Sequence, residues 1–569
     1  MGSRRRRSTA TVALVVAALA STLPASAQTL EDLFRSARGA AFTPVEPRVA
    51  NRPGVLLETD FYVYGPQTGF DVPDVTVSVD SNNYAAPVTL YLYWENRNNG
   101  QRQFYNVGSG FGAQERDLFG TAASPAAVFV PDLDELRLFG PGSAFGALPG
   151  AIPRGTGLYQ FVLELRDADG EDVVARGNAM YNFVDGVVPV SGNINGGNWT
   201  NDNAYYLATP VNVTGGTLNI QAGTVILGSK AQEGTLVVRQ GARIQAVGDV
   251  MRPIIFSSEQ QVGQRAPGDW GGLVINGTAP VNIANPLGEG DSGPYGGNDP
   301  NSDSGRLSYV RVEFAGIRFS DQNELNGIAL QGVGKGTQLD HLQIHFNQDD
   351  GIEFFGGTVD AKYVLITDAE DDSLDWTFGW TGRLQHFVAV QRHGPADNGI
   401  EADNQENADD ALPRSNPMIY NATWAGADPL PGVSTGRGIL LRRGTHATIK
   451  NFIVENFTNV GIEVNGTVSE GAVGAGIDIS HGFIFSNAGG ASDVQGYLQG
   501  QPNVFFSDPR LVDPFGLSAD VTPLSPQARG AGSNATPPAD GFFDNVNYIG
   551  GVNPNDPWIF EGWTTFSDN

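Results

Sequence analysis

Three segments in the second half of the chain decide the fold: DGIEFFGG at 350–357, DSLDWTFG at 372–379 and NGIEADN at 398–404. In each segment apolar and polar residues alternate as in a β-strand, and Gly or Asn ends the stretch. Looser copies are GTLVVRQG at 234–241, GGLVINGT at 271–278, NGIALQG at 326–332, RGILLRRG at 437–444 and VGIEVNG at 460–466. Repeats of this kind predict a coil that stacks on itself.

A second type of strand lies between these copies. Its members are YVRVEFAG at 309–316, HLQIHFN at 341–347, YVLITDA at 363–369, HFVAVQR at 386–392, IKNFIVENF at 449–457 and ISHGFIFSN at 479–487. The repeats are roughly 22 to 39 residues long, and no long amphipathic helix occurs among them. We therefore predict a right-handed parallel β-helix over residues 187–493, with an inserted loop at Asn285–Gly305. A β-propeller would need four strands per unit, which the pattern lacks.

The two ends of the chain have a different character. Residues 1–27 carry basic residues, a short apolar run and a small-residue cleavage site, which predicts a secretory signal peptide. Residues 28–53 are a predicted linker. Residues 54–186 alternate aromatic and β-branched residues between turns, which predicts an immunoglobulin-like or jelly-roll β-sandwich with a hairpin turn at Asp167–Gly170. For residues 494–569 we predict loops and a cap, in which the aromatic segment IFEGWTTF at 559–566 closes the open end of the helix.

The amino-acid composition narrows the range of possible functions. The chain has no Cys, which excludes disulfides and thiolate chemistry, and its formal net charge is −28. Such a surface repels nucleic acid and favours cations such as Ca²⁺, although acidity can also serve solubility alone. No apolar run is long enough to span a membrane, so we expect a secreted or periplasmic protein. Nucleophile elbows, Walker loops and HExxH motifs are all missing from the sequence.

Acidic residues recur at equivalent positions of successive repeats. When the repeats are aligned on their inward Ile or Leu, the next residue points outward. That outward column contains Glu353, Asp375 and Glu401, and the column two residues before the aligned position contains Asp350 and Asp372. Asp349 and Asp371 precede these two acids. Equivalent positions of stacked coils are about 4.8 Å apart, so the sequence predicts an outward wall of carboxylates, which we call the acid ladder.

Like charges at this spacing repel one another, so the acid ladder needs compensation. A bound cation, most simply Ca²⁺, would supply it, and the candidate ligands are Asp349, Asp350, Glu353, Asp371, Asp372, Asp375 and Glu401. Protonation is a second route, and it would raise carboxyl pKa values as a general acid requires. In a third reading, the acids serve only turns by accepting backbone hydrogen bonds.

Several of these segments resemble known proteins. GDWGGLVINGTAPVN at 268–282, GRLSYVRVEFAG at 305–316, HFNQDDGIEFFGGTV at 345–359, DDSLDW at 371–376, DNGIEADN at 397–404 and GILLRRGT at 438–445 are similar to the pectin-lyase-like β-helix superfamily. More narrowly, they resemble a family of exported bacterial β-helix proteins of unassigned activity. The resemblance covers residues 193–569.

The resemblance implies carbohydrate chemistry. Polysaccharide lyases of this superfamily combine Ca²⁺-binding acids with a basic residue that abstracts a proton. By this resemblance Asp350, Asp372, Asp375 and Glu401 would be the catalytic acids and Arg437 the basic partner. The hydrolases of the superfamily use paired carboxyl groups. Their full motif set is absent here, since only His393–Gly394 is similar to one of its elements.

Two further groups of residues lie near the acid ladder. His341 and His345 are spaced to share one face of a strand, which would suit zinc, but we favour ordinary surface histidines. The aromatic residues beside the ladder could stack on sugar rings or pack into the core; they are Phe354, Phe355, Trp376, Phe378 and Trp380.

Together these features predict an exported, all-β protein of two domains. We expect it to bind or process extracellular polysaccharide, or another cell-surface component, through the acid ladder. As an enzyme it would be a polysaccharide lyase or a glycoside hydrolase. The alternative is a non-enzymatic surface or matrix protein, similar to an adhesin, that uses cations for stiffness. This functional reading rests on fold analogy.

Overall fold

The computed structural model describes residues 54–567, except for 60–61, 65–73, 81–85, 107–108, 121–125, 130–131, 140–142, 146–155, 321–322, 427–434 and 531. The predicted signal peptide and linker, 1–27 and 28–53, lie outside the described residues. The chain forms two compact units. The first ends at Val187 and includes 516–518 and 565–568, and the second consists of Val188–Phe515 and Ala519–Thr564.

The first unit is a β-sandwich, as predicted. One sheet has the order β1 (Gly54–Thr59), β3 (Val75–Asp80), β7 (Leu133–Phe139). The other has the order β2 (Val63–Tyr64), β9 (Val173–Phe183), β8 (Gly157–Arg166), β4 (Thr89–Asn96), β5 (Gln101–Asn106), β6 (Gly110–Gly112). Leu57 and Val77 from the first sheet share one buried cluster with Leu92 and Phe161 from the second. The choice between an immunoglobulin-like and a jelly-roll topology stays a prediction.

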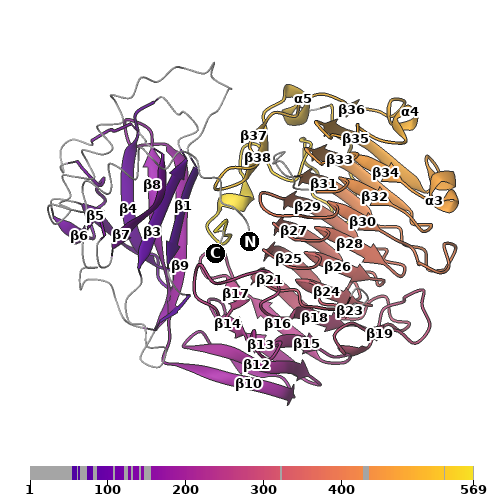
Figure 1. Cartoon of the computed structure of the whole chain (residues 1–569), viewed down its shortest axis with the longest axis horizontal. Helices are drawn as coiled ribbons and strands as arrows, with labels where there is room; N and C mark the ends of the chain where they lie inside the picture. The colour runs from indigo at the N-terminus through magenta and orange to yellow at the C-terminus, as the bar shows by residue number, and fades with distance from the viewer. Residues whose placement is uncertain are drawn as a thin grey trace. The chain divides into compact units, whose positions relative to one another are not determined.

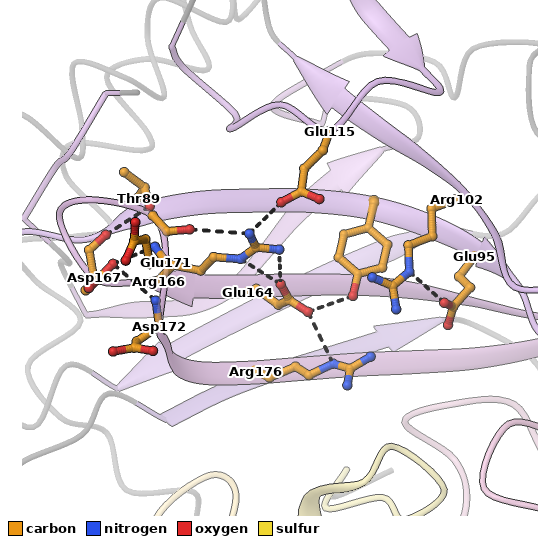
Figure 2. Close-up of polar contacts among 12 residues, drawn as sticks. Thr89, Glu95, Arg102, Glu115, Glu164, Arg166, Asp167, Glu171, Asp172 and Arg176 are labelled. Atoms are coloured by element: carbon orange, nitrogen blue, oxygen red, sulfur yellow. Dashed lines mark hydrogen bonds and ion pairs between the residues drawn. The ribbon is translucent and has the colours of Figure 1, made fainter. Parts of the chain in front are cut away.

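The outer face of the six-stranded sheet carries charges that pair with one another (Figure 2). Glu95 accepts a hydrogen bond from Arg102 Nε at 2.7 Å. Glu164 forms ion pairs with Arg166 at 2.8 Å and with Arg176 at 3.8 Å. The charged side chains on this face therefore pair with one another and help to hold neighbouring strands together.

The predicted hairpin turn between β8 and β9 is confirmed. The backbone N–H of Gly170 donates to the carbonyl of Asp167 at 3.0 Å, and the N–H of Glu171 donates to Asp167 Oδ1 at 2.8 Å. Gly170 has a φ of 78°, which a glycine adopts without strain.

The second unit is a parallel β-helix in which 23 strands belong to one continuous hydrogen-bonded sheet (Figure 1). The short strands that contain the repeated segments are β15 (Thr235–Val238), β18 (Gly272–Asn276), β24 (Ile328–Gln331), β26 (Ile352–Phe355), β28 (Leu374–Thr377), β30 (Ile400–Ala402), β32 (Ile439–Leu441) and β34 (Ile462–Val464). Each pairs in parallel with the next of this series. We call this stack the ladder sheet.

Longer strands complete the coils. They are β21 (Gly305–Glu313), β25 (Gln338–His345), β27 (Asp360–Thr367), β29 (Arg383–Val390), β31 (Met418–Ala425), β33 (Ala447–Glu455) and β35 (Ile477–Phe485). The first coils contain β10 (Gly186–Ile194), β11 (Gly197–Trp199), β12 (Asn203–Val213), β13 (Thr217–Ile220), β14 (Val225–Gly228), β16 (Arg243–Val247) and β17 (Ile254–Ser258).

Each long strand bends at one residue in the left-handed region. These residues have φ between 51° and 59° and are Tyr309, His341, Tyr363, His386, Asn421, Asn451 and His481. The bend breaks the simple alternation of the strand. His341 and His345 therefore do not form the single-faced pair expected from their spacing.

The core is built from matching inward positions of successive coils. The residues aligned in the ladder sheet are all buried in one cluster: Leu236, Leu273, Ile328, Ile352, Leu374, Ile400, Ile439 and Ile462. Because like side chains stack on like, the interior is continuous along the helix axis.

A glycine before the inward Ile is required by close packing. An added Cβ on Gly351 would lie 2.6 Å from Ile366 Cγ2 and 2.7 Å from the carbonyl oxygen of Ser373. Gly351 does not have a positive φ, so the Asp-Gly pair at this position is no left-handed turn. The glycine lets the coil turn tightly against its neighbour.

The aromatic C-terminal segment does not close the end of the helix, contrary to the prediction. Instead it runs along the flank made by the long strands. Asn451 donates to the carbonyl of Ala535 and Asn421 to that of Tyr548, while the Trp563 ring lies 5.6 Å from Tyr309. At the C-terminal coils, residues of α3 (Thr467–Ala472) and α4 (Gln495–Leu498) pack on the core. The ring side chains at the left-handed positions of the long strands stack on one another along this flank. They offer the C-terminal segment a long aromatic surface, which explains its course.

The remaining elements are short. They are β19 (Leu287–Gly288), β20 (Gly293–Pro294), β22 (Arg318–Ser320), β23 (Asn323–Glu324), β36 (Val504–Phe505), β37 (Leu511–Asp513), β38 (Asp520–Pro523), α5 (Pro526–Arg529) and the 3-10 turn η2 (Trp558–Phe560). In the part of the chain that the structure describes, no helix is long and apolar enough to cross a membrane.

Candidate functional site

The structure places the acid ladder in register. Glu353 lies opposite Asp375 on the paired strands β26 and β28, and Asp375 lies opposite Glu401 on β28 and β30. The same outward column continues to Leu440 and Glu463 on the next two strands. The sequence alignment on Ile352, Leu374 and Ile400 is therefore the alignment that the strands adopt.

Much of the acid ladder is covered, which differs from the expected wall facing solvent. Asp349, Asp350, Glu353 and Asp372 are at most 7% exposed, whereas Asp371, Asp375 and Glu401 are partly exposed. The cover comes from inserted segments that repeat patterns cannot predict. Glu289, in the loop at 285–305, interacts electrostatically with Glu353, and Glu324, on β23, with Asp349.

Two of the acids also support the backbone. Asp350 Oδ1 accepts the N–H of Asp372 at 3.1 Å, and Asp372 Oδ1 accepts the N–H of Asn398 at 2.6 Å. Asn398 Oδ1 in turn accepts the N–H of Arg437 at 3.2 Å. This chain of side-chain to backbone bonds links four successive coils, and we call it the Asx ladder.

Burial and mutual repulsion raise the pKa values of these carboxyl groups. Desolvation is the first cause in every case and neighbouring carboxylates are the next, except that Arg442, which lowers the pKa, is the second cause for Glu401. The pKa rises well above the ordinary range for Asp350, Glu353, Asp372 and Asp375. It rises to about 8 for Asp349, to about 6 for Asp371 and to about 7 for Glu401. The charged form of the ladder is therefore unfavourable unless a cation compensates it.

The acids meet the requirement for such a cation. Two oxygens that bind one Ca²⁺ at about 2.4 Å each are at most about 4.8 Å apart. Ligand oxygens of Asp372, Asp375 and Glu401 all lie within 4.8 Å of one another, and so do those of Asp350, Glu353 and Asp375. Two further sets are Asp350, Asp371 and Asp372, and Glu324, Asp349 and Asp371.

Asp375 is common to the first two sets, and one of its oxygens has no hydrogen bond. Within the described residues, its buried Oδ1 lacks any partner. Beside the ladder, the fully buried Asn326 donates its Nδ2 to Glu353 Oε2 at 2.7 Å, while its own Oδ1 lacks a partner there. Buried oxygens without donors fit an oxygen-preferring cation such as Ca²⁺.

Arginines border the open end of the ladder. Arg442 pairs with Glu401 and, through Nε, with Asp403 at 2.8 Å. Arg443 bonds Asp403 at 2.7 Å, and Arg437 Nε donates to Glu463 Oε2 at 2.6 Å. The role of Arg437 as a base stays a prediction, and its guanidinium is held by a carboxylate.

A cavity of about 350 Å³ opens over these residues. Its lining includes Glu401, Leu440 and Glu463 from the outward column, together with Arg437, Arg442 and Arg443. Ligand pockets in proteins have volumes of about 300–1,000 Å³, so this cavity is large enough for a small ligand or a short part of a chain.

The aromatic residues beside the ladder are mostly core residues. Trp376 and Trp380 are fully buried, and the Trp380 ring stacks on Phe354 with centroids 3.9 Å apart. Phe355 packs under the inserted loop, and Phe378 packs partly against the same cluster. They do not offer a surface to a sugar ring.

The preference for surface histidines is wrong for His345. This residue is buried, and its Nδ1 lies 2.6 Å from Thr367 Oγ1. His341 stacks between Tyr309 and Tyr363, with centroid distances of 4.2 and 4.5 Å. Neither histidine belongs to a set of potential metal ligands among the described residues.

Sequence reasoning missed Glu289, Glu324 and Asp403. The first two lie in inserted segments, where no repeat pattern gives their place. Asp403 follows Glu401 by two residues in the quoted segment NGIEADN, so strand alternation could have put it on the same face.

Comparison with known proteins agrees with this architecture. A family model for a pectate-lyase-like β-helix domain matches residues 193–501. No curated protein matches the chain. Among solved structures, the chain is similar to a family 28 exopolygalacturonase of Yersinia enterocolitica, with 12% identity, a TM-score of 0.16, and coverage of 60% of this chain and 84% of that chain. That likeness is too weak to support a conclusion about activity.

The match to the family model spans the coils of the second unit and more than half of the chain. It confirms the predicted relation to the pectin-lyase-like superfamily. The chain therefore belongs to the family of proteins with a pectate-lyase-like β-helix domain.

Proposed function

We propose that this is an exported protein that binds extracellular polysaccharide at the open end of the acid ladder, with a Ca²⁺ ion held by Asp372, Asp375 and Glu401. One observation supports this above all others. Oxygens of these three side chains lie within 4.8 Å of one another, and a buried oxygen of Asp375 has no hydrogen-bond donor among the described residues. The name of the family, which refers to pectate lyase, supports a polysaccharide as the ligand.

The bound ion would neutralise the ladder and supply a positive centre for anionic sugar groups. The protein adds its own positive groups. Arg437, Arg442 and Arg443 line the cavity beside Glu401, and a guanidinium binds a carboxylate with two parallel hydrogen bonds. The lining also contains the carboxyl groups of Asp397, Glu401, Asp409 and Glu463, so the bound ion is what makes an acidic polysaccharide suit the site better than a neutral one.

In its ion-free form, in which Glu401 and Asp375 do not ligate Ca²⁺, the arrangement of acids favours hydrolysis over elimination; with Ca²⁺ bound, the same carboxylates serve binding alone. Burial raises the pKa of Glu401 to about 7, which is suitable for a general acid near neutral pH. Asp375, opposite Glu401 on the next strand, provides a second carboxyl group, as glycoside hydrolysis requires. Elimination needs a base, and the predicted base Arg437 donates its Nε to Glu463.

The Asx ladder favours a second candidate function, a non-enzymatic structural role. Asp350 and Asp372 each accept, on one carboxylate oxygen, a hydrogen bond from a backbone N–H of the next coil. With a cation beside them, these acids would stiffen the solenoid as expected of a surface or matrix protein.

A polysaccharide panel tests the proposal. Polygalacturonate, alginate, xylan and dextran are incubated with the protein in Ca²⁺ and in chelator, and binding, new reducing ends and unsaturated uronate absorbance are measured. We expect Ca²⁺-dependent binding of the acidic polymers, weakened in Asp375→Asn. Glu463→Gln is the matched control for the ion, because Glu463 is on the same column but outside every carboxylate set. Ca²⁺-dependent stability without binding of any polymer would favour the structural role.

A further inference from the structure

The outward column of the ladder sheet changes character along the helix axis. Its first members, Val237, Val274 and Ala329, are apolar, and the register carries them directly into Glu353, Asp375 and Glu401. The apolar members are buried in a cluster with Tyr295 and Leu325 from inserted segments. The column is therefore closed at its N-terminal end.

Hydrogen bonds fix the inserted loop at 285–305, which covers this end, to the coils. Asn276 Nδ2 donates to the carbonyl of Ser292 at 2.6 Å, and Ser292 Oγ donates to Gln331 Oε1 at 3.0 Å. The N–H of Gly290 donates to Asn323 Oδ1 at 2.7 Å, which joins the loop to the hairpin of β22 and β23. Figure 1 shows β19 and β23 beside β18 and β24, on the side of the helix where the ladder sheet begins.

A second inserted segment meets the first at the edge of the ladder sheet. Asn282 Nδ2 donates to Asn404 Oδ1 at 2.9 Å and to the carbonyl of Pro413 at 3.1 Å, and Gln405 Nε2 donates back to the Asn282 carbonyl at 2.9 Å. These bonds join the loop that covers the apolar end to the loop at 404–413.

The acids at the other end of the column are more exposed. Glu353 is 7% exposed, while the side chains of Glu401 and Glu463 are 18% and 20% exposed. The cavity of about 350 Å³ lies over Glu401, Leu440 and Glu463 and does not extend to Glu353. Within the outward column, the lining of the cavity therefore ends at Glu401, two strands away from the covered Glu353.

We propose that the site recognises the end of a polysaccharide chain and not an internal stretch. This inference rests on the proposed function. A chain that lies in the cavity from Glu463 reaches Glu401. Its next sugars would meet Asp375 and then the covered Glu353, beside which the Tyr295 ring of the inserted loop lies 6.2 Å from Phe355. The sugar beside Glu401 is therefore the terminal one, because the anchored loop covers the column beyond Asp375 and leaves the chain no continuation along it.

Chain length provides the test. Polygalacturonate is cut by mild acid into fractions of decreasing average length, and the mass concentration that half-saturates the protein is measured for each fraction in Ca²⁺. The same series is run with alginate. If chain ends bind, a tenfold shorter average length gives a tenfold lower half-saturating mass, because the number of ends per unit mass rises tenfold.

The alternative outcomes are distinct. A half-saturating mass that does not depend on chain length shows binding to internal stretches; it overturns end recognition and leaves the proposed function standing. Absence of binding by every polymer and fraction overturns both proposals. Reduction of the reducing ends with borohydride then identifies the end that binds, since loss of binding assigns the reducing end and retention assigns the other.

Discussion

Asp372 accepts two hydrogen bonds from Asn398, one from its backbone N–H at 2.6 Å and one from its Nδ2 at 2.9 Å, both on the same oxygen, Oδ1. This carboxylate therefore has two separable properties. One oxygen holds the next coil in place, and the charge belongs to the set shared with Asp375 and Glu401.

Two substitutions at Asp372 separate these properties. Asp372→Ala removes the acceptor and leaves a buried N–H without a partner, which we expect to cost about 1–3 kcal/mol of unfolding free energy. Asp372→Asn keeps an acceptor for the backbone N–H and removes the charge, so it should cost less than Asp372→Ala and should weaken Ca²⁺ binding. Urea unfolding in chelator compares the two. Equal losses of stability would show that the hydrogen bond contributes nothing.

The stability of the protein should fall as the pH rises when no divalent cation is present. The carboxyl groups of Asp349 and Glu401 have pKa values of about 8 and about 7 in the folded chain, above their ordinary values of 3.8 and 4.5. Between the unfolded and the folded pKa the folded state binds more protons, so each pH increase in that interval destabilises it. We expect the melting temperature in chelator to decrease from about pH 5 to about pH 8.

A matched variant identifies the ladder as the source of this dependence. Asp375→Asn removes one of the repelling charges, so its melting temperature should fall less steeply over the same interval. Ca²⁺ should reduce the slope in the wild-type protein and less so in the variant. Parallel slopes for the two proteins in chelator would assign the pH dependence to other groups.

Trp376 should matter for stability and not for ligand binding. The side chain is fully buried, and its Nε1 donates to Thr445 Oγ1 at 3.0 Å. Trp376→Phe loses that bond and part of the core volume, and Trp376→Ala should cost about 3–5 kcal/mol. Urea unfolding measures the loss, and binding of polygalacturonate by folded Trp376→Phe should equal that of the wild-type protein. Lost binding with unchanged stability would place the ring in the ligand site instead.

Arg442 should stabilise the rim of the cavity. It pairs with both Glu401 and Asp403, so Arg442→Met leaves Glu401 without this cation and Asp403 with Arg443 alone. We expect a loss of about 1–3 kcal/mol, as for hydrogen bonds to charged groups. The control is Arg252→Met, because Arg252 pairs with Asp249 at the surface, and such a pair contributes about 1 kcal/mol or less. Thermal melts in chelator should separate the two; similar losses would mean that the rim pair has no special weight.

Much of the fold could be predicted from the repeat period of the sequence. Ile352, Leu374 and Ile400 align the coils, and the residue after each one reaches the outer face because strand alternation permits only two directions. The same rule puts Trp376, two residues after Leu374, inside the core, so its burial could have been predicted from the segment that predicted the ladder.

The rest of the site depends on contacts between distant segments. Arg442 reaches Glu401 across 41 residues of sequence, and Glu289 lies in a loop with no counterpart in other repeats. Insertions follow no period, so their packing over Glu353 and their closure of one end of the column cannot be predicted from it. The signal peptide and the secreted location stay predictions.

Calorimetric titration of Ca²⁺ into the purified protein at pH 7.5 tests the central claim most directly. We predict saturable binding that Asp375→Asn weakens on the order of tenfold or more, because the number of ligand charges sets Ca²⁺ affinity. Glu463→Gln should bind as the wild-type protein does. Absence of saturable binding, or equal affinity in Asp375→Asn, would contradict a cation site on the acid ladder.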